Sequence, residues 1–153
     1  MGYTHYLYRK PHLNPAHYTA FAAEAKVLLT TIEQILQRDH GTGLAGWDGS
    51  GSPQIDTEHV AFNGAAPADY ETCRIDRDFD PDRITTRDDV GRVFTFCKTA
   101  EKPYDAAVTA VYALAVDHFG DAVVVDSDGG PEAIEAGRAL ASRLLGRTLR
   151  AAA

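Results

Sequence analysis

The densest run of side chains that can do chemistry lies between Cys97 and Asp105. It reads Cys-Lys-Thr-Ala-Glu-Lys-Pro-Tyr-Asp, and its pattern predicts the end of a strand, a short loop and the start of a helix. Backbone N–H groups at a helix start, together with two Lys side chains, attract a carboxylate or a phosphate. We therefore expect this segment to supply ligand-binding residues, namely Cys97, Lys98, Thr99, Lys102, Tyr104 and Asp105.

Cys97 has two interpretations. Neighbouring ammonium groups of Lys98 and Lys102 favour a thiolate, which is a nucleophile. The alternative is that Cys97 packs as a small hydrophobic side chain while the lysines are solvated. Because no histidine can be placed beside Cys97 from the sequence, we expect packing rather than cysteine catalysis.

A second polar segment is the turn that contains Asp126 and Asp128, between a predicted strand and a predicted helix. Two carboxylates one residue apart resemble the start of a calcium loop, and Mg²⁺ or Ca²⁺ would neutralise them. The later ligand positions of an EF-hand are missing, and a capping turn explains both acids without an ion. We expect the turn and predict no metal site, while Asp128 is retained as a predicted ligand contact.

Two histidines, His5 and His59, lie in predicted strands, and Asn63 falls on the same face as His59. If these strands are neighbours, the imidazoles can converge on a metal ion or act as acid and base. The alternative is that each histidine is a hydrogen-bonded structural residue. The sequence does not fix the pairing of the strands, so His5, His59 and Asn63 are predicted as ligand contacts only.

Tyrosine is abundant, with seven residues in a chain of 153. Tyr and Trp are typical of recognition surfaces, because the ring supplies area and the polar tip supplies direction, but they are equally common at the margin of a core. The only Trp, Trp47, lies in the segment 44–54. Three glycines and a proline there remove any preference for helix or strand, so we expect a flexible loop.

Periodicity predicts eight elements in the order β-α-β-β-β-α-β-α. Alternation or short apolar runs predict strands over 2–9, 58–62, 71–77, 92–99 and 122–125, the last of them buried and central, with Asn63-Gly64 as a turn. Apolar spacing of three and four predicts helices from Asn14-Pro15 to Arg38, from Pro103 to Phe119 and from Pro131 to Gly146. This order favours one α+β domain over 1–153, with a mixed, mainly antiparallel sheet and three helices on one face.

Composition narrows the class of protein. The formal net charge of −7 disfavours nucleic acid and anionic membranes as partners. No apolar run is long enough to span a bilayer, and two cysteines without a Cys-x-x-Cys pair are typical of reduced cytoplasmic proteins. No Walker loop, dinucleotide fingerprint, nucleophile elbow or zinc helix is present, so whether the protein is an enzyme stays open.

Several short blocks together resemble a known family. They are Met1-Gly2-Tyr3-Thr4-His5-Tyr6, the block from His59 to Gly64, Phe96-Cys97-Lys98-Thr99 with Lys102-Pro103-Tyr104-Asp105, and Ser127-Asp128-Gly129. In this order they are similar to a family of small uncharacterised proteins of bacteria, their phages and some fungi. The resemblance implies a shared architecture and a shared site, and it carries no activity.

Two functions are consistent with these observations. The first is binding of a small-molecule or nucleotide-like ligand at the strand ends. The alternative is a non-catalytic protein-interaction module, of the phage accessory or antidefence type, that uses the acidic middle of the chain and the Trp47 loop. A small molecule or a protein is therefore the expected partner, and the sequence indicates neither a cofactor nor an oligomeric state.

Overall fold

The computed structural model describes residues 3–79 and 87–151. The helices are α1 (Pro15–His40), α2 (Asp105–Phe119) and α3 (Pro131–Leu145), with two 3₁₀ turns at Trp47–Gly49 and Gly120–Ala122. The strands are β1 (Thr4–Arg9), β2 (Leu44–Ala45), β3 (Gln54–Ile55), β4 (Val60–Gly64), β5 (Cys73–Arg74), β6 (Val93–Lys98) and β7 (Val123–Ser127). The sequence Asp80-Pro81-Asp82 is typical of a turn, but it lies outside the described residues, as does the predicted strand residue Gly2.

The fold is α+β, as predicted, but its described strands form two antiparallel sheets rather than one mixed sheet. The first has the order β6-β1-β7, and in the second β4 lies between β2 and β3 and also pairs with β5. The prediction that the strand near 122–125 is central is wrong, because β7 is an edge strand and β1 is central. A short apolar run indicates a buried strand. The helices bury one face of β7, so the strand can be apolar without being central.

Local signals set the bounds of α1. The Oδ1 of Asn14 accepts a hydrogen bond from the His17 N–H at 3.0 Å, and Pro15 follows as the first helical residue. At the other end Gly41 has φ 68° and donates its N–H to the Gln37 carbonyl at 3.0 Å. The predicted helix is therefore confirmed, two residues longer than expected.

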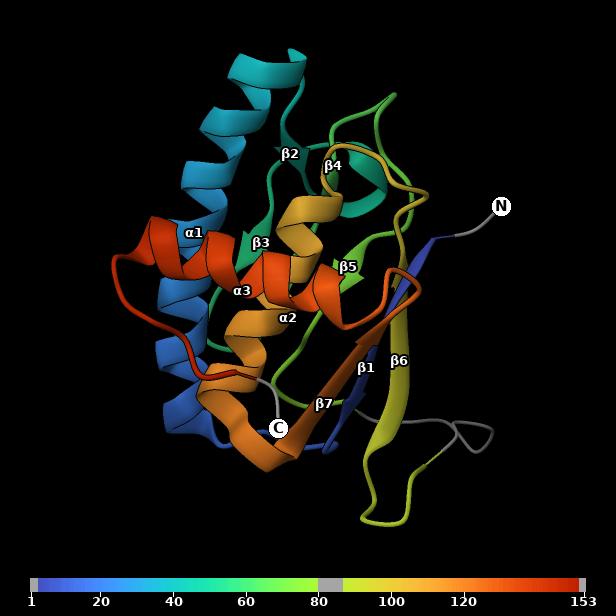
Figure 1. Cartoon of the computed structure of the whole chain (residues 1–153), viewed down its shortest axis with the longest axis vertical. Coiled ribbons are helices and arrows are strands. Elements are labelled where there is room, and N and C mark those ends of the chain that lie inside the picture. The colour runs from blue at the N-terminus through green and yellow to red at the C-terminus, as the bar shows by residue number, and fades with distance from the viewer. Residues whose placement is uncertain (1–2, 80–86, 152–153) are drawn as a thin grey trace.

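The middle helix, α2, is buried on all sides from Ala107 to Ala115, although the sequence predicted one buried stripe. It packs against α1, α3 and β7, and the picture places the helices together on one side of the strands β7, β1 and β6 (Figure 1). Its close contact with α3 depends on Gly137, since a Cβ there would lie 2.5 Å from the Thr109 carbonyl carbon. Small residues let α3 approach α2 closely, and α1, α3 and β7 together then cover all sides of α2.

Two predicted irregular segments carry regular structure. The segment 44–54 begins with β2, contains the 3₁₀ turn Trp47–Gly49 and ends at β3, and both ends are held by pairing with β4. Asn63-Gly64 is the end of β4 rather than a turn, with Asn63 opposite Ala45. Within the described residues, no helix combines the length and the hydropathy that crossing a membrane requires.

Candidate functional site

The site is built around His5, which lies in the central strand. The register places His5 opposite Cys97 of β6 and opposite Ser127 of β7. Alternation along β1 turns its side chain to the face that the helices cover, and the residue is 0% exposed. A buried imidazole needs partners for both ring nitrogens, and this one has them.

Both partners are side chains from distant parts of the chain. His5 Nδ1 lies 2.8 Å from Ser127 Oγ, and His5 Nε2 lies 2.6 Å from Asp105 Oδ1. The same Asp105 oxygen accepts a hydrogen bond from the Thr99 hydroxyl. The result is a continuous chain of hydrogen bonds from the end of β7 through β1 to the start of α2.

The direction of these hydrogen bonds follows from the donors available. Asp105 Oδ1 can only accept, so the proton shared with it belongs to His5 Nε2. The Gly129 N–H donates to Ser127 Oγ at 3.0 Å, which leaves the Ser127 hydroxyl proton free to point at His5 Nδ1. An imidazole that donates from Nε2 to Asp105 and accepts at Nδ1 from the Ser127 hydroxyl satisfies all of these groups.

Asp105 is placed by a tight turn at the end of β6. Ala100 and Glu101 adopt positive φ values of 51° and 57°, and the Thr99 N–H donates to the Tyr3 carbonyl at 2.9 Å. The chain then enters α2, so the Asp105 carboxylate lies in the first turn, where the helix dipole favours an anion. The side chain is 25% exposed, and both described hydrogen bonds use Oδ1, which leaves Oδ2 for an external donor.

Asp128, which follows β7, forms hydrogen bonds to two residues of β1 at the same edge of the sheet. Its Oδ2 accepts the Thr4 N–H at 3.0 Å, and its Oδ1 accepts the Tyr6 hydroxyl at 2.7 Å. Because Tyr6 donates this hydrogen bond to a carboxylate, the pKa of Tyr6 is raised above its ordinary value. Gly129 leaves room for Tyr3, whose hydroxyl would lie 2.0 Å from a Cβ at that position. The Tyr3 ring in turn meets the His5 ring edge to face at 5.2 Å.

Ser, His and Asp in a hydrogen-bonded row are the residue types of nucleophilic hydrolases. Here, however, Ser127 is only 7% exposed and its oxygen is already held by the Gly129 N–H. The accessible end of the row is Asp105. The arrangement is therefore suited to binding a hydrogen-bond donor at Asp105.

Other predicted site residues are buried or form hydrogen bonds that stabilise the fold. Cys97 is 1% exposed, which favours the packed interpretation over the nucleophile. The Tyr104 hydroxyl donates to the Glu71 carbonyl at 2.6 Å, and burial raises the pKa of Tyr104. The Lys98 N–H donates to Glu71 Oε2 at 2.8 Å. Lys98 and Lys102 are partly exposed. Lys98 pairs with Thr4, so alternation turns its side chain to the face of the sheet opposite to that of His5.

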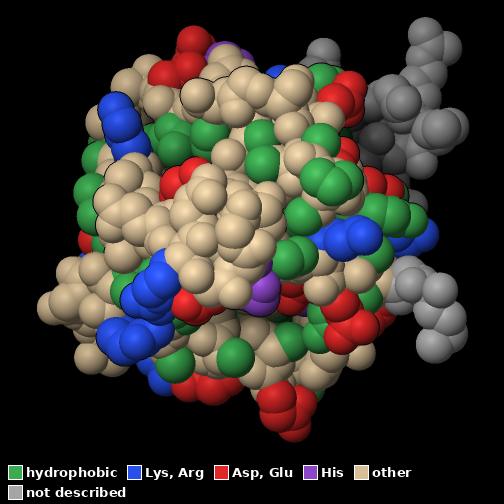
Figure 2. Space-filling view, turned by 90° about the horizontal axis from the view of Figure 1, so that it is seen from above, with side chains coloured by type: hydrophobic (Ala, Val, Ile, Leu, Met, Phe, Trp, Pro, Cys, Tyr) green, Lys and Arg blue, Asp and Glu red, His purple; other side chains and the backbone are tan. Residues whose placement is uncertain are grey.

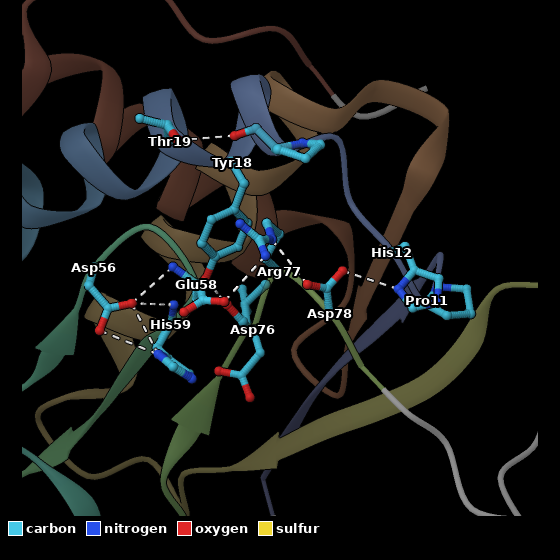
Figure 3. Close-up of polar contacts among 12 residues, drawn as sticks. Pro11, His12, Tyr18, Thr19, Asp56, Glu58, His59, Asp76, Arg77 and Asp78 are labelled. Carbon is cyan, nitrogen blue, oxygen red and sulfur yellow. Dashed lines mark hydrogen bonds and ion pairs between the residues drawn. The ribbon is translucent and has the colours of Figure 1, made fainter.

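His59 and Asn63 do not join His5. β1 pairs with β6 and β7, whereas β4 belongs to the second sheet, so the hypothesis that the two histidine strands are neighbours is wrong. His59 Nδ1 lies 3.0 Å from Asp56 Oδ1, and Figure 3 shows the His59 ring beside that carboxylate. Asn63 is 0% exposed and closes the loop after β4 by hydrogen bonds to the Tyr70 N–H and carbonyl.

The acidic turn holds backbone groups. Asp126 Oδ1 accepts the Ser127 N–H at 2.8 Å, and Asp128 Oδ2 accepts the Thr4 N–H of β1. The predicted capping role is wrong, because the N-cap of α3 is Gly130 and no side chain caps this helix. In the ranges 3–79 and 87–151, no three His, Cys, Asp or Glu side chains are grouped so that they could hold a metal ion.

Trp47 is 58% exposed and its ring lies 5.5 Å from the Arg74 guanidinium.

Sequence reasoning did not select Ser127 or Tyr3. Ser127 follows Asp126 in the apolar strand pattern, and alternation places it on the buried face, but only the pairing of β7 with β1 brings it to His5. One hollow away from this site lies between β7 and α3, beside Arg138 and Arg150. Comparison with family models, curated proteins and solved structures gives no match to this chain, and the family resemblance stays a prediction.

Proposed function

We propose that the protein binds a small polar molecule at the strand-end site, through a hydrogen bond from the ligand to Asp105. The observation that supports this most is the buried row Ser127, His5 and Asp105, which opens to solvent at one carboxylate. Buried polar rows are costly unless fully satisfied, and such rows are frequent at functional sites. A row that ends in a quarter-exposed carboxylate fits a binding function better than a purely structural one.

The chemistry of the accessible groups limits the ligand. Asp105 and Asp128 present carboxylates, which repel phosphate and attract N–H and O–H donors. Figure 2 looks onto the end of the molecule where β1 begins, and Lys and Arg side chains there form small separate groups rather than one basic patch. A nucleoside-like molecule, whose base and sugar supply donors, fits the site better than a nucleotide with several phosphates.

A thermal-shift screen tests this proposal. Nucleosides, nucleotides, amines and sugars are added at millimolar concentration, and a ligand that binds only the native state raises the melting temperature. Asp105→Asn replaces the Oδ2 acceptor by a donor and should abolish the shift, whereas Asp39→Asn, at an exposed position on α1, should leave it unchanged. Equal shifts for the wild type and Asp105→Asn, or no shift with any member of the screen, would refute the proposal.

A further inference from the structure

The face of the first sheet that points away from the helices carries a continuous aromatic surface. Alternation turns Tyr6 and Tyr8 of β1 to this side, and Phe94 and Phe96 of β6 lie opposite them, Phe94 against Tyr8 and Phe96 against Tyr6. Ring centroids are 5.2 Å apart for Tyr8 and Phe94, 5.7 Å for Phe94 and Phe96, and 5.9 Å for Tyr6 and Phe94. We call these four residues the aromatic face.

The aromatic face is partly accessible to solvent. Phe96 is 54% exposed, and Val124, on β7 opposite Tyr8, is 45% exposed. The helices that bury Leu7 lie on the other side of the sheet, and none of the described helices crosses this one (Figure 1). Tyr6, Tyr8 and Phe94 are half-buried and Phe96 is the exposed ring of the four. Neighbouring rings that stay accessible on a sheet are typical of recognition surfaces.

One margin of the aromatic face is acidic. Asp126 of β7 lies directly opposite Tyr6 and is exposed, and Asp128 accepts the Tyr6 hydroxyl at 2.7 Å. Lys98, opposite Thr4, lies beyond Phe96 on the same face and adds one cation on the β6 side, whereas Asp126 and Asp128 lie on the β7 side. Rings beside carboxylates attract a cation twice, through the ring faces and through the charge.

We propose that the aromatic face binds an arginine-containing segment of a partner protein. A guanidinium is planar, so one can stack on Tyr6 while its N–H groups reach Asp126 on the neighbouring strand, and a second Arg of the same segment can stack on the exposed ring of Phe96. Single-stranded nucleic acid could stack its bases on the same rings, but its phosphates would meet Asp126, Asp128 and a chain of net charge −7. A second copy of this chain would bring the same negative charge to the interface. Charge complementarity therefore selects a basic peptide.

Fluorescence polarisation tests this inference with labelled eight-residue peptides of alternating Arg and Gly, of Lys and Gly, and of Glu and Gly, at 150 mM salt, and with a labelled thymidine oligonucleotide. The Arg peptide should bind most tightly and the Glu peptide should not bind. Phe96→Ser should weaken binding about fivefold, in line with one exposed cation–π contact, and Asp126→Asn about threefold. Val27→Ser, which removes another exposed apolar side chain, on α1, should leave binding unchanged.

Several outcomes would overturn the inference. They are absence of Arg-peptide binding at millimolar concentration, equal binding of the Arg and Glu peptides, or equal affinities for Phe96→Ser and the wild type. Preference for the oligonucleotide would assign the face to nucleic acid instead. Concentration-dependent dimerisation in sedimentation, lost in Phe96→Ser, would assign it to a second copy. Circular dichroism of both variants checks that the fold is unchanged, and Asp105 is untouched, so the result is independent of the strand-end ligand.

Discussion

His5 Nε2 lies 2.6 Å from Asp105 Oδ1, so the central strand is hydrogen-bonded by a side chain to the first residue of a helix 100 residues later. The imidazole is fully buried and the carboxylate is partly exposed. Whatever changes the charge or position of Asp105 therefore changes the surroundings of a group in the core. This coupling leads to the first of four predictions.

Removing the carboxylate should cost more than neutralising it. Asp105→Ala leaves His5 Nε2 and the Thr99 hydroxyl without an acceptor, and we expect a loss of about 1–3 kcal/mol in the free energy of unfolding. Asp105→Asn retains an amide oxygen in place of Oδ1 and should lose less. Urea unfolding followed by circular dichroism at pH 7 measures both. Equal stabilities for Asp105→Ala and the wild type would contradict the described hydrogen bonds.

Asn63 should be intolerant of isosteric change. Its Nδ2 donates to the Tyr70 carbonyl at 2.9 Å, and its Oδ1 accepts the N–H groups of Tyr70 and Gly64. Asn63→Asp replaces the donor by a buried charge, with an expected loss of about 3 kcal/mol in the free energy of unfolding.

The matched control for that variant is Asn14→Ala, which removes an exposed helix cap and should cost about 1 kcal/mol. Chemical denaturation of both variants measures the difference. A smaller loss for Asn63→Asp than for Asn14→Ala would show that the loop after β4 is not held by Asn63.

We expect that a single methyl group added between α2 and α3 destabilises the protein. Alanine in a helix is ordinarily more stable than glycine, but a Cβ on Gly137 would lie 2.5 Å from the Thr109 backbone. We expect Gly137→Ala to lose about 1–3 kcal/mol through forced separation of the helices. Ala136→Gly, at an exposed position of α3, should lose about 1 kcal/mol from propensity alone. Thermal unfolding compares the two, and a stabilised Gly137→Ala would contradict the described packing.

Low pH should weaken the ion pair between Glu24 of α1 and Arg147 of the C-terminal segment. Arg147 donates two hydrogen bonds to Glu24, at 2.9 and 2.5 Å, and His118 lies 2.7 Å away. The Arg147 guanidinium, and after it His118, hold the pKa of Glu24 below its ordinary value of 4.5, against the opposing effect of partial burial. A carboxylate whose folded pKa is lowered stabilises the protein above the unfolded pKa, and this contribution is lost as the pH falls through the folded pKa.

Glu24→Gln should therefore cost about 1 kcal/mol at pH 7, and the difference from the wild type should shrink as the pH falls below 4.5. Urea unfolding at pH 7, 5 and 3 measures it. The control is Asp89→Asn, an exposed carboxylate outside the helices for which the described residues show no ion pair, with little effect expected at any pH. A difference for Glu24→Gln that is independent of pH would exclude the charged link.

Much of the local structure could be predicted because it depends on neighbouring residues. Asn14-Pro15 and Gly41 set the bounds of α1 by capping and by a left-handed residue, and both operate within one helical turn. Alternation predicted the strand β1, and the structure shows that its His5, Leu7 and Arg9 side is the buried one. His5, Thr99, Asp105 and Asp128 were selected because they lie at predicted strand ends and a helix start, and the structure brings these four to one edge.

The amino-acid sequence by itself determined which segments are helices, where they begin and end, and which polar residues stand at strand ends, because these depend on contacts within a few residues. Only the tertiary structure decided that β1 is central, that Ser127 meets His5, and that His59 and Asn63 lie apart from the site. Strand pairing joins residues more than one hundred positions apart, and its choice depends on the total burial of the assembled sheets and helices. No single segment contains that information.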